Sequence, residues 1–181
     1  GQTNVCFLSD SGYFYDVSKH CELAYAGNSR GSAWFDFDND GDLDVAVSDY
    51  NGAGRVYENQ QAAGHHWIRL RLEGAGGNRN AVGARVAVRF GDDQQRFDQV
   101  VCGKGFLSQN PYPLHFGLGA HDEVTEVLII WPDGRKQTLN QLVVDQVHRL
   151  QQPEGALGLF VAALELAAHH EELRVVMLVG V

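Results

Sequence analysis

Alternation of polar and apolar residues is the feature that most constrains the fold of this chain. Residues 67–72 and 84–90 alternate so that their arginines lie on one face and their apolar residues on the other, which is the pattern of half-buried β-strands. Further strand candidates, separated by glycine- and proline-containing turns, are residues 97–102, 114–118, 124–131, 137–139 and 147–150. Strands at this spacing predict an antiparallel β-sandwich-like domain over residues 65–152.

A second set of short strands precedes this domain. The candidates are residues 5–8, 13–17, 32–35, 43–47 and 55–59, and Asn51-Gly52 has the composition of a hairpin turn. Residues 5–8 and 56–59 both come before a glycine-containing turn, which suggests an internal repeat of about fifty residues. A single repeat this small does not cover both faces of its sheet, so we expect residues 1–62 to pack on neighbouring repeats or on the following domain.

The tail, residues 153–181, has a different composition. Residues 156–173 are rich in Ala, Leu and Glu, which favours a helix. A docked or stray terminal helix is one interpretation. A membrane- or partner-binding helix is the other, because apolar residues surround most of it. No apolar run reaches the ~20 residues that span a bilayer.

The composition excludes one class of function and allows another. The chain has 181 residues with 14 basic and 23 acidic side chains, a formal net charge of −9. This sign argues against a protein that binds nucleic acid through phosphate contacts. It permits cation binding. The only methionine is Met177, so we expect the chain to be a processed product or a piece of a longer protein.

The acidic segment 36–44 is the strongest chemical signal. Its carboxylates recur at alternate positions and would repel one another without a cation or water between them. Such a loop can wrap one Ca²⁺, which takes six to eight oxygen ligands. The predicted side-chain ligands are Asp36, Asp38, Asp40 and Asp44. Asp42 is predicted to contribute its backbone carbonyl, and Gly41 to permit the sharp turn.

Two other kinds of metal site fit this segment less well. An EF-hand loop would carry Glu at its twelfth position, where this chain has Val47. Mg²⁺ demands a tighter octahedral geometry and keeps its waters. A solvated acidic turn without an ion remains the alternative.

The cysteines leave the redox environment open. The chain has three cysteines, Cys6, Cys21 and Cys102, so they cannot all pair within one molecule. Cys6 and Cys21 are a possible disulfide that would leave Cys102 free. Three unpaired thiols are the equal alternative.

Two groups of motifs resemble known families. Residues 31–44, GSAWFDFDNDGDLD, resemble the FG-GAP (VCBS-type) repeat of integrin-like β-propellers. The later motifs resemble the ASPIC and UnbV domain: HWIRL at 66–70, NRNAVGARV at 78–86, GFLSQ at 105–109, LHFGLG at 114–119 and IWPDG at 130–134. Together they resemble the cartilage acidic protein family. The resemblance implies an all-β chain, with part of a calcium-binding propeller followed by a β-rich domain.

The functional expectation follows from this resemblance. It implies a secreted, extracellular or bacterial cell-envelope module that binds Ca²⁺, contacts further propeller blades and recognises a protein or glycan without catalysis. The alternative is part of a secreted enzyme whose active site lies on missing blades or at the domain interface. Ser108 and His115 invite a hydrolase interpretation, but Ser108 lacks the Gly-x-Ser-x-Gly elbow, and the resemblance makes both residues structural.

Overall fold

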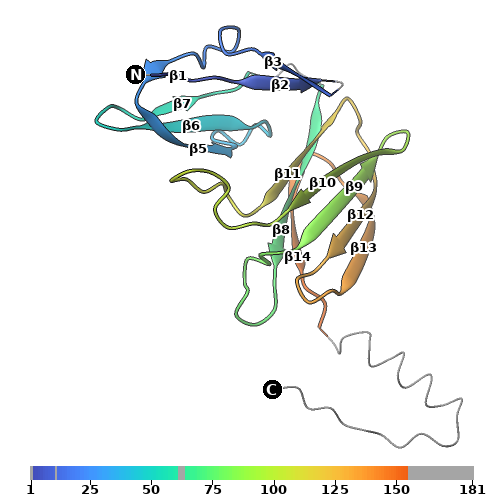
Figure 1. The fold of residues 1–181 in the computed structure, drawn as a ribbon. Helices are drawn as coiled ribbons and strands as arrows, with labels where there is room; N and C mark the ends of the chain where they lie inside the picture. The colour runs from blue at the N-terminus through green and yellow to red at the C-terminus, as the bar shows by residue number, and fades with distance from the viewer. Residues whose placement is uncertain (1, 11, 61–63, 155–181) are drawn as a thin grey trace, which may run out of the picture.

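The protein is all-β, as the sequence predicted. A computed structural model describes residues 2–10, 12–60 and 64–154 (Figure 1), and within these ranges every regular element is a strand. The strands are β1 (Gln2–Thr3), β2 (Phe7–Asp10), β3 (Tyr13–Asp16), β4 (Ala26–Gly27), β5 (Ser29–Phe35), β6 (Asp44–Asp49), β7 (Arg55–Tyr57), β8 (His66–Glu73), β9 (Arg85–Phe90), β10 (Gln94–Gln99), β11 (Leu114–Gly119), β12 (Val124–Ile130), β13 (Lys136–Leu142) and β14 (Gln146–Gln151). The predicted helix over residues 156–173 lies outside the described residues. Within the described ranges, the structure has no helix able to cross a membrane.

The hydrophobic core lies between the two sheets of β8–β14. One sheet has the strand order β10-β9-β12-β13 and the other β11-β8-β14. Alternate residues of β8, β9, β11 and β12 face inward, as the period-two pattern predicted. The buried side chains of these strands include Ile68, Leu70, Leu72, Val86, Val88, Phe90, Leu114, Phe116, Leu118, Val124, Val127 and Ile129. Trp131 is buried with them, and its Nε1 donates a hydrogen bond to Gln137 Oε1 at 3.1 Å.

One strand pairing differs from the antiparallel expectation. β14 runs parallel to β8, with Gln146 opposite Ile68 and Gln151 opposite Glu73. A parallel pair requires a long crossover connection. Residues 74–145 supply it by forming the other strands of the sandwich, so β14 returns to β8 in the same direction.

The predicted strand at residues 97–102 is placed too late in the chain. β10 pairs with β9 from Gln94 opposite Phe90 to Gln99 opposite Arg85. The hairpin closes early because Gly91 and Asp93 both adopt positive φ, at 53° and 62°, which makes a tight turn. One step beyond the last pair of this ladder, the Val100 N–H still donates to the Ala84 carbonyl at 2.9 Å.

The N-terminal strands form smaller sheets. β5, β6 and β7 make a three-stranded antiparallel sheet, β2 pairs with β3, and β1 pairs with β4. Asn51, at φ 62°, lies in the turn that joins β6 to β7, so the predicted hairpin is confirmed. Of the hydrophobic residues in this part that the structure describes, only Val45 is buried. The large exposed ones are Val5, Phe7, Leu8, Tyr13, Phe14, Tyr15, Trp34, Phe37, Tyr50 and Val56.

The two parts of the chain meet along β5 and the acidic loop that follows it. The long loop before β11 reaches β5 (Figure 1), where Trp34 N donates to Asn110 Oδ1 at 3.1 Å. Gly31 of β5 lies so close to this loop that an added Cβ would come within 2.9 Å of the Leu107 carbonyl. Gly41 of the acidic loop lies against the Trp67 indole of β8.

Gly41 supplies the first test of this packing. Its φ of 99° is strained for any side chain, and an added Cβ would overlap the Trp67 indole. We expect Gly41→Ala to lower the free energy of unfolding in EDTA by about 2–4 kcal/mol, from backbone strain plus overpacking. Gly77→Ala is the matched control, because Gly77 has open space around it. Urea unfolding of both variants measures the difference, and equal stabilities would contradict the packing.

Candidate metal centre

The acidic loop between β5 and β6 is folded by its own carboxylates. Asp38 Oδ1 accepts the backbone N–H of Asp40 at 3.2 Å, and Asp40 Oδ1 accepts that of Asp42 at 3.0 Å. Asp36 Oδ2 accepts the N–H of Gly41 at 3.2 Å. Asn39 and Gly41 have positive φ values of 65° and 99°. Local hydrogen bonds of this kind compete with regular secondary structure and curl the chain into a loop.

Three of the predicted ligands converge. One carboxylate oxygen from each of Asp36, Asp38 and Asp40 lies within 4.8 Å of the others. The Asp36 side chain is only 1% exposed, and its Oδ1 is buried without a hydrogen-bond partner. Hard oxygen donors brought together in this way are the ligand chemistry of Ca²⁺. The residues present therefore fit a calcium ion.

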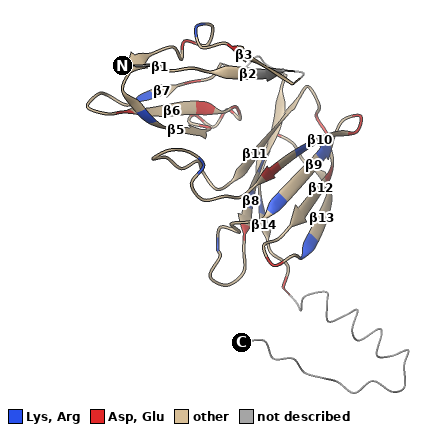
Figure 2. Ribbon diagram, viewed as in Figure 1, with Lys and Arg blue, Asp and Glu red and all other residues tan. Residues whose placement is uncertain are grey.

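The two remaining predicted ligands lie outside this group of three. Asp44 is fully buried, and its Oδ2 and Oδ1 accept the N–H groups of Phe37 at 2.6 Å and Asn59 at 2.8 Å. Asp44 therefore ties the start of the loop to the segment after β7. Asp42 is also buried and donates its N–H to Asp40. Their roles as side-chain and carbonyl ligands remain predictions. Acidic residues gather where β6 begins (Figure 2).

Arg69 is a residue of this site that the sequence interpretation missed. Its guanidinium forms an ion pair with Asp36 Oδ2, and its side chain is 17% exposed. The guanidinium carbon also lies 5.2 Å from the centre of the Trp67 ring, within the range of a cation–π contact. Alternation along β8 correctly placed Arg69 on the face away from the core. Nothing in the sequence indicated that a carboxylate 33 positions earlier would cover that face.

His115 of β11 joins the same cluster. Its ring stacks on the Trp67 ring with centroids 5.8 Å apart and planes 18° from parallel. The pKa of His115 is lowered from 6.5 to about 4, mainly by burial and in addition by the positive charge of Arg69, while the negative charge of Asp36 opposes the shift. Ser108 Oγ is buried without a hydrogen-bond partner. It therefore makes no hydrogen bond to His115, and the pair does not form the nucleophile–base contact of a hydrolase.

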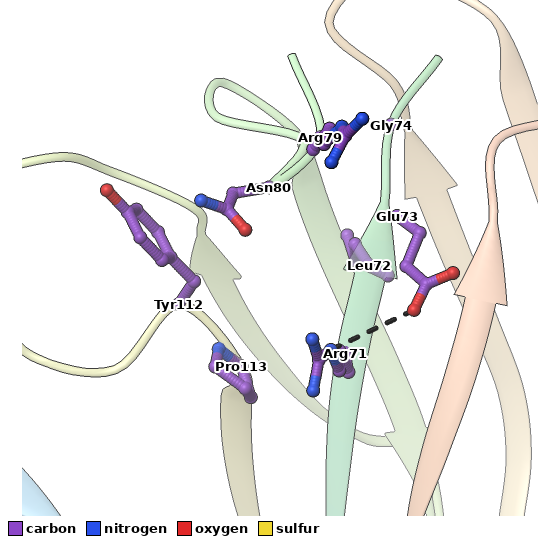
Figure 3. Close-up of a pocket in the computed structure, with 8 residues that line it drawn as sticks. All are labelled: Arg71, Leu72, Glu73, Gly74, Arg79, Asn80, Tyr112 and Pro113. Carbon is purple, nitrogen blue, oxygen red and sulfur yellow. Dashed lines mark ion pairs between the residues drawn. The ribbon is translucent and has the colours of Figure 1, made fainter. Parts of the chain in front are cut away.

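Two open pockets lie in this part of the molecule, one beside His115 and one at the end of β8. One, of about 580 Å³, is lined by residues including Asp42, Asn59, Arg96 and His115. The other, of about 490 Å³, lies at the end of β8. Figure 3 shows Arg71 and Glu73 of β8 in the second pocket, with Arg79 and Asn80 on the following loop and Tyr112 across from them. Arg71 Nε is 3.8 Å from Glu73 Oε1. Two guanidinium groups and an amide at one opening can bind an anionic group.

The three cysteines are free thiols in this structure. Cys6 and Cys21, the possible disulfide, are in side-chain contact with each other. The Cys102 sulfur lies 3.7 Å from the Tyr112 hydroxyl, in the other part of the chain. The pairing therefore stays a prediction.

Comparison with known proteins identifies the second part of the chain. Residues 74–157 match the family model described as ASPIC and UnbV. The chain contains an ASPIC and UnbV domain. The match begins after β8, yet β8 is the central strand of the sheet β11-β8-β14 and contributes three core residues. The folded ASPIC and UnbV domain therefore includes β8.

Curated relatives agree with this assignment. Cartilage acidic protein 1 of Homo sapiens is 30% identical over 117 residues, which are 63% of this chain and 17% of that protein. The proteins of the same name from Xenopus tropicalis and Mus musculus are 30% identical over 112 residues, 60% of this chain and 17% of each. The chain thus spans 17% of the length of these relatives. The predicted ASPIC and UnbV resemblance is confirmed, and the FG-GAP resemblance remains a prediction.

The low pKa of His115 makes stability depend on pH. Between pH 6.5 and about 4 the unfolded chain binds more protons than the folded one. The stabilisation by neutral His115 is therefore full above pH 6.5 and is lost as the pH falls toward 4. In the wild-type chain, His115 should lower the free energy of unfolding by on the order of 1 kcal/mol between pH 7 and pH 5. This decrease should be absent from His115→Gln. NMR titration, with the His115 signal assigned from the variant, should give a midpoint near 4, and a midpoint near 6.5 would contradict the structure.

Proposed function

We propose that this chain is part of an extracellular, calcium-binding interaction module without catalytic activity. The observation that carries the proposal is the Asp36 carboxylate: its Oδ1 is buried without a hydrogen-bond partner, and the carboxylate has an oxygen within 4.8 Å of oxygens of Asp38 and Asp40. A buried anionic oxygen with no donor is costly. A calcium ion at the loop would satisfy it and offset the repulsion among the three carboxylates.

In this proposal the ion stabilises the loop and supplies no chemistry of reaction. Asp36, Asp38 and Asp40 would hold it with their side chains, Asp42 with its carbonyl, and Asp44 would ligate it or keep the loop closed. Extracellular calcium sites have dissociation constants of ~10⁻⁴–10⁻³ M, weak enough to work where the ion is abundant. This fits the proposed secreted or cell-envelope location.

The N-terminal strands are proposed to be part of an FG-GAP or VCBS repeat, over residues 1–62. Two features support this: the acidic loop joins β5 to β6 of one antiparallel sheet, and the apolar side chains of this part are largely exposed. Exposed large apolar side chains in this number favour a partner surface that covers them. We propose that further propeller blades of a longer chain cover it, with residues 65–152 as the following domain.

The proposed ligand is an extracellular protein or glycan with an anionic group. The pocket that contains Arg71 and Arg79 supports this choice, because it opens two guanidinium groups to solvent on a chain whose net charge is −9. A secreted enzyme with an active site on other blades or at the domain interface is the alternative. The names of the curated relatives describe no catalytic activity, and Ser108 and His115 form no hydrogen bond with each other.

Calcium should stabilise the folded chain selectively. Binding to the folded state alone adds RT ln(1 + [Ca²⁺]/Kd), which is about 1.4–2.7 kcal/mol at 10 mM for the Kd class above. We expect a rise in the melting temperature with Ca²⁺ after EDTA treatment, and a smaller rise with Mg²⁺. Asp38→Asn and Asp40→Asn should abolish the rise with Ca²⁺, because each replaces a charged ligand with a neutral side chain of similar shape.

Asp92→Asn is the matched control for this titration, since Asp92 is an exposed aspartate in the β9–β10 turn. It should keep the full calcium response. The absence of a response in a folded wild-type chain, or an equal loss in all three variants, would refute the calcium site.

A further inference from the structure

The chain around Cys6 holds this residue beside Val17. β2 pairs with β3 from Phe7 opposite Asp16. The ladder continues one step further, because Val17 N donates to the Cys6 carbonyl at 2.9 Å. Ser18 Oγ in turn accepts the Cys6 N–H at 2.7 Å. The position of Cys6 is therefore set by two backbone contacts and does not depend on its own sulfur.

A single turn then brings Cys21 back to the same place. The N–H groups of His20 and Cys21 both donate to the Val17 carbonyl, at 2.8 and 3.1 Å. The Cys21 sulfur lies 3.1 Å from that carbonyl oxygen. Val17 thus donates its N–H to Cys6 and accepts at its carbonyl from Cys21. The two cysteines therefore share one residue as neighbour.

The two side chains meet. Both line one pocket between β6 and the turn that contains Cys21, and the two thiols are close enough for each to affect the other's proton. Cys21 is exposed, whereas Cys6 is partly buried. Burial and the neighbouring Cys21 raise the pKa of the Cys6 thiol, so Cys21 is the accessible thiol to react first.

We propose that Cys6 and Cys21 form an intramolecular disulfide when the chain meets a disulfide oxidant such as oxidised glutathione. The Cys21 thiolate attacks one glutathione sulfur, forms a mixed disulfide and releases one glutathione thiolate. The Cys6 sulfur, after losing its proton, attacks the Cys21 sulfur and releases the second. Two cysteine thiols are oxidised, one glutathione disulfide is reduced to two thiols, and the two protons pass to the solvent and the released thiolates.

This cross-link would fasten the β2–β3 hairpin to the turn that follows it. Few buried side chains hold this part of the chain, as the exposed Phe7, Tyr13 and Phe14 illustrate. A covalent bond limits the unfolded chain and stabilises such a weakly packed segment. The inference rests on the contacts of Cys6 and Cys21 and is independent of the calcium site.

Peptide mapping tests the pairing directly. Full-length chain is equilibrated in a glutathione redox buffer, then denatured, alkylated and cut with trypsin without reduction. Lys19 separates the two cysteines and Arg30 ends the second peptide. We expect residues 1–19 linked to residues 20–30, with Cys102 alkylated. Alkylated Cys6 and Cys21, a link from either to Cys102, or glutathione retained on Cys21 would each overturn the proposal.

Two controls separate the folded geometry from chance pairing. Cys102→Ser should keep the linked peptide, since the Cys102 sulfur contacts Tyr112 instead. The ratio of cross-linked to reduced chain, at one glutathione ratio, should be at least tenfold higher in native buffer than in concentrated urea. An equal ratio in both would mean that the fold does not bring the thiols together, and would also overturn the proposal.

Discussion

The ion pair between Asp36 and Arg69 joins the two parts of this chain. Asp36 comes from the loop between β5 and β6, and Arg69 from the middle of β8. The Asp36 side chain is almost wholly removed from water, and a charge buried in this way is strongly destabilising when it loses its partner. The acidic loop can therefore adopt this buried position only when the ASPIC and UnbV domain lies beside it. The same contact places Gly41 on Trp67, and Trp67 on His115.

Asp36 also connects this interface to the proposed calcium ion. Its Oδ2 accepts from Arg69 and Gly41, its Oδ1 has no hydrogen-bond partner, and one of the two oxygens lies within 4.8 Å of oxygens of Asp38 and Asp40. A cation at Oδ1 and the Arg69 guanidinium at Oδ2 would then both contact the Asp36 carboxylate. In the proposed function, calcium thus does more than relieve repulsion within the loop. The ion would fix the orientation of the side chain that joins the two parts of the chain, so that the N-terminal strands and the following domain would present one surface.

The sequence predicted those features that depend on local periodicity and turn chemistry. The alternation in β8 and β9, the Asn51 hairpin and the convergence of Asp36, Asp38 and Asp40 all follow from neighbours within a few residues. The features it missed depend on contacts between distant segments. Arg69 has an ordinary exposed position until β5 and its loop cover it, and the parallel pairing of β14 with β8 depends on the path of the whole sandwich. The sequence placed the start of β10 too late for a local reason, because positive φ at Asp93 was not visible in its residue type.

A double-mutant cycle between Asp36 and Arg69 measures directly whether this ion pair couples the acidic loop to β8. Asp36→Asn, Arg69→Met and the double variant would be unfolded by urea in EDTA, so that no cation contributes to the difference. We expect non-additive effects, with a coupling free energy above about 1 kcal/mol, because each single variant leaves the other group poorly compensated. Effects that add within about 0.5 kcal/mol would contradict this expectation. The acidic loop would then be held against β8 by packing alone.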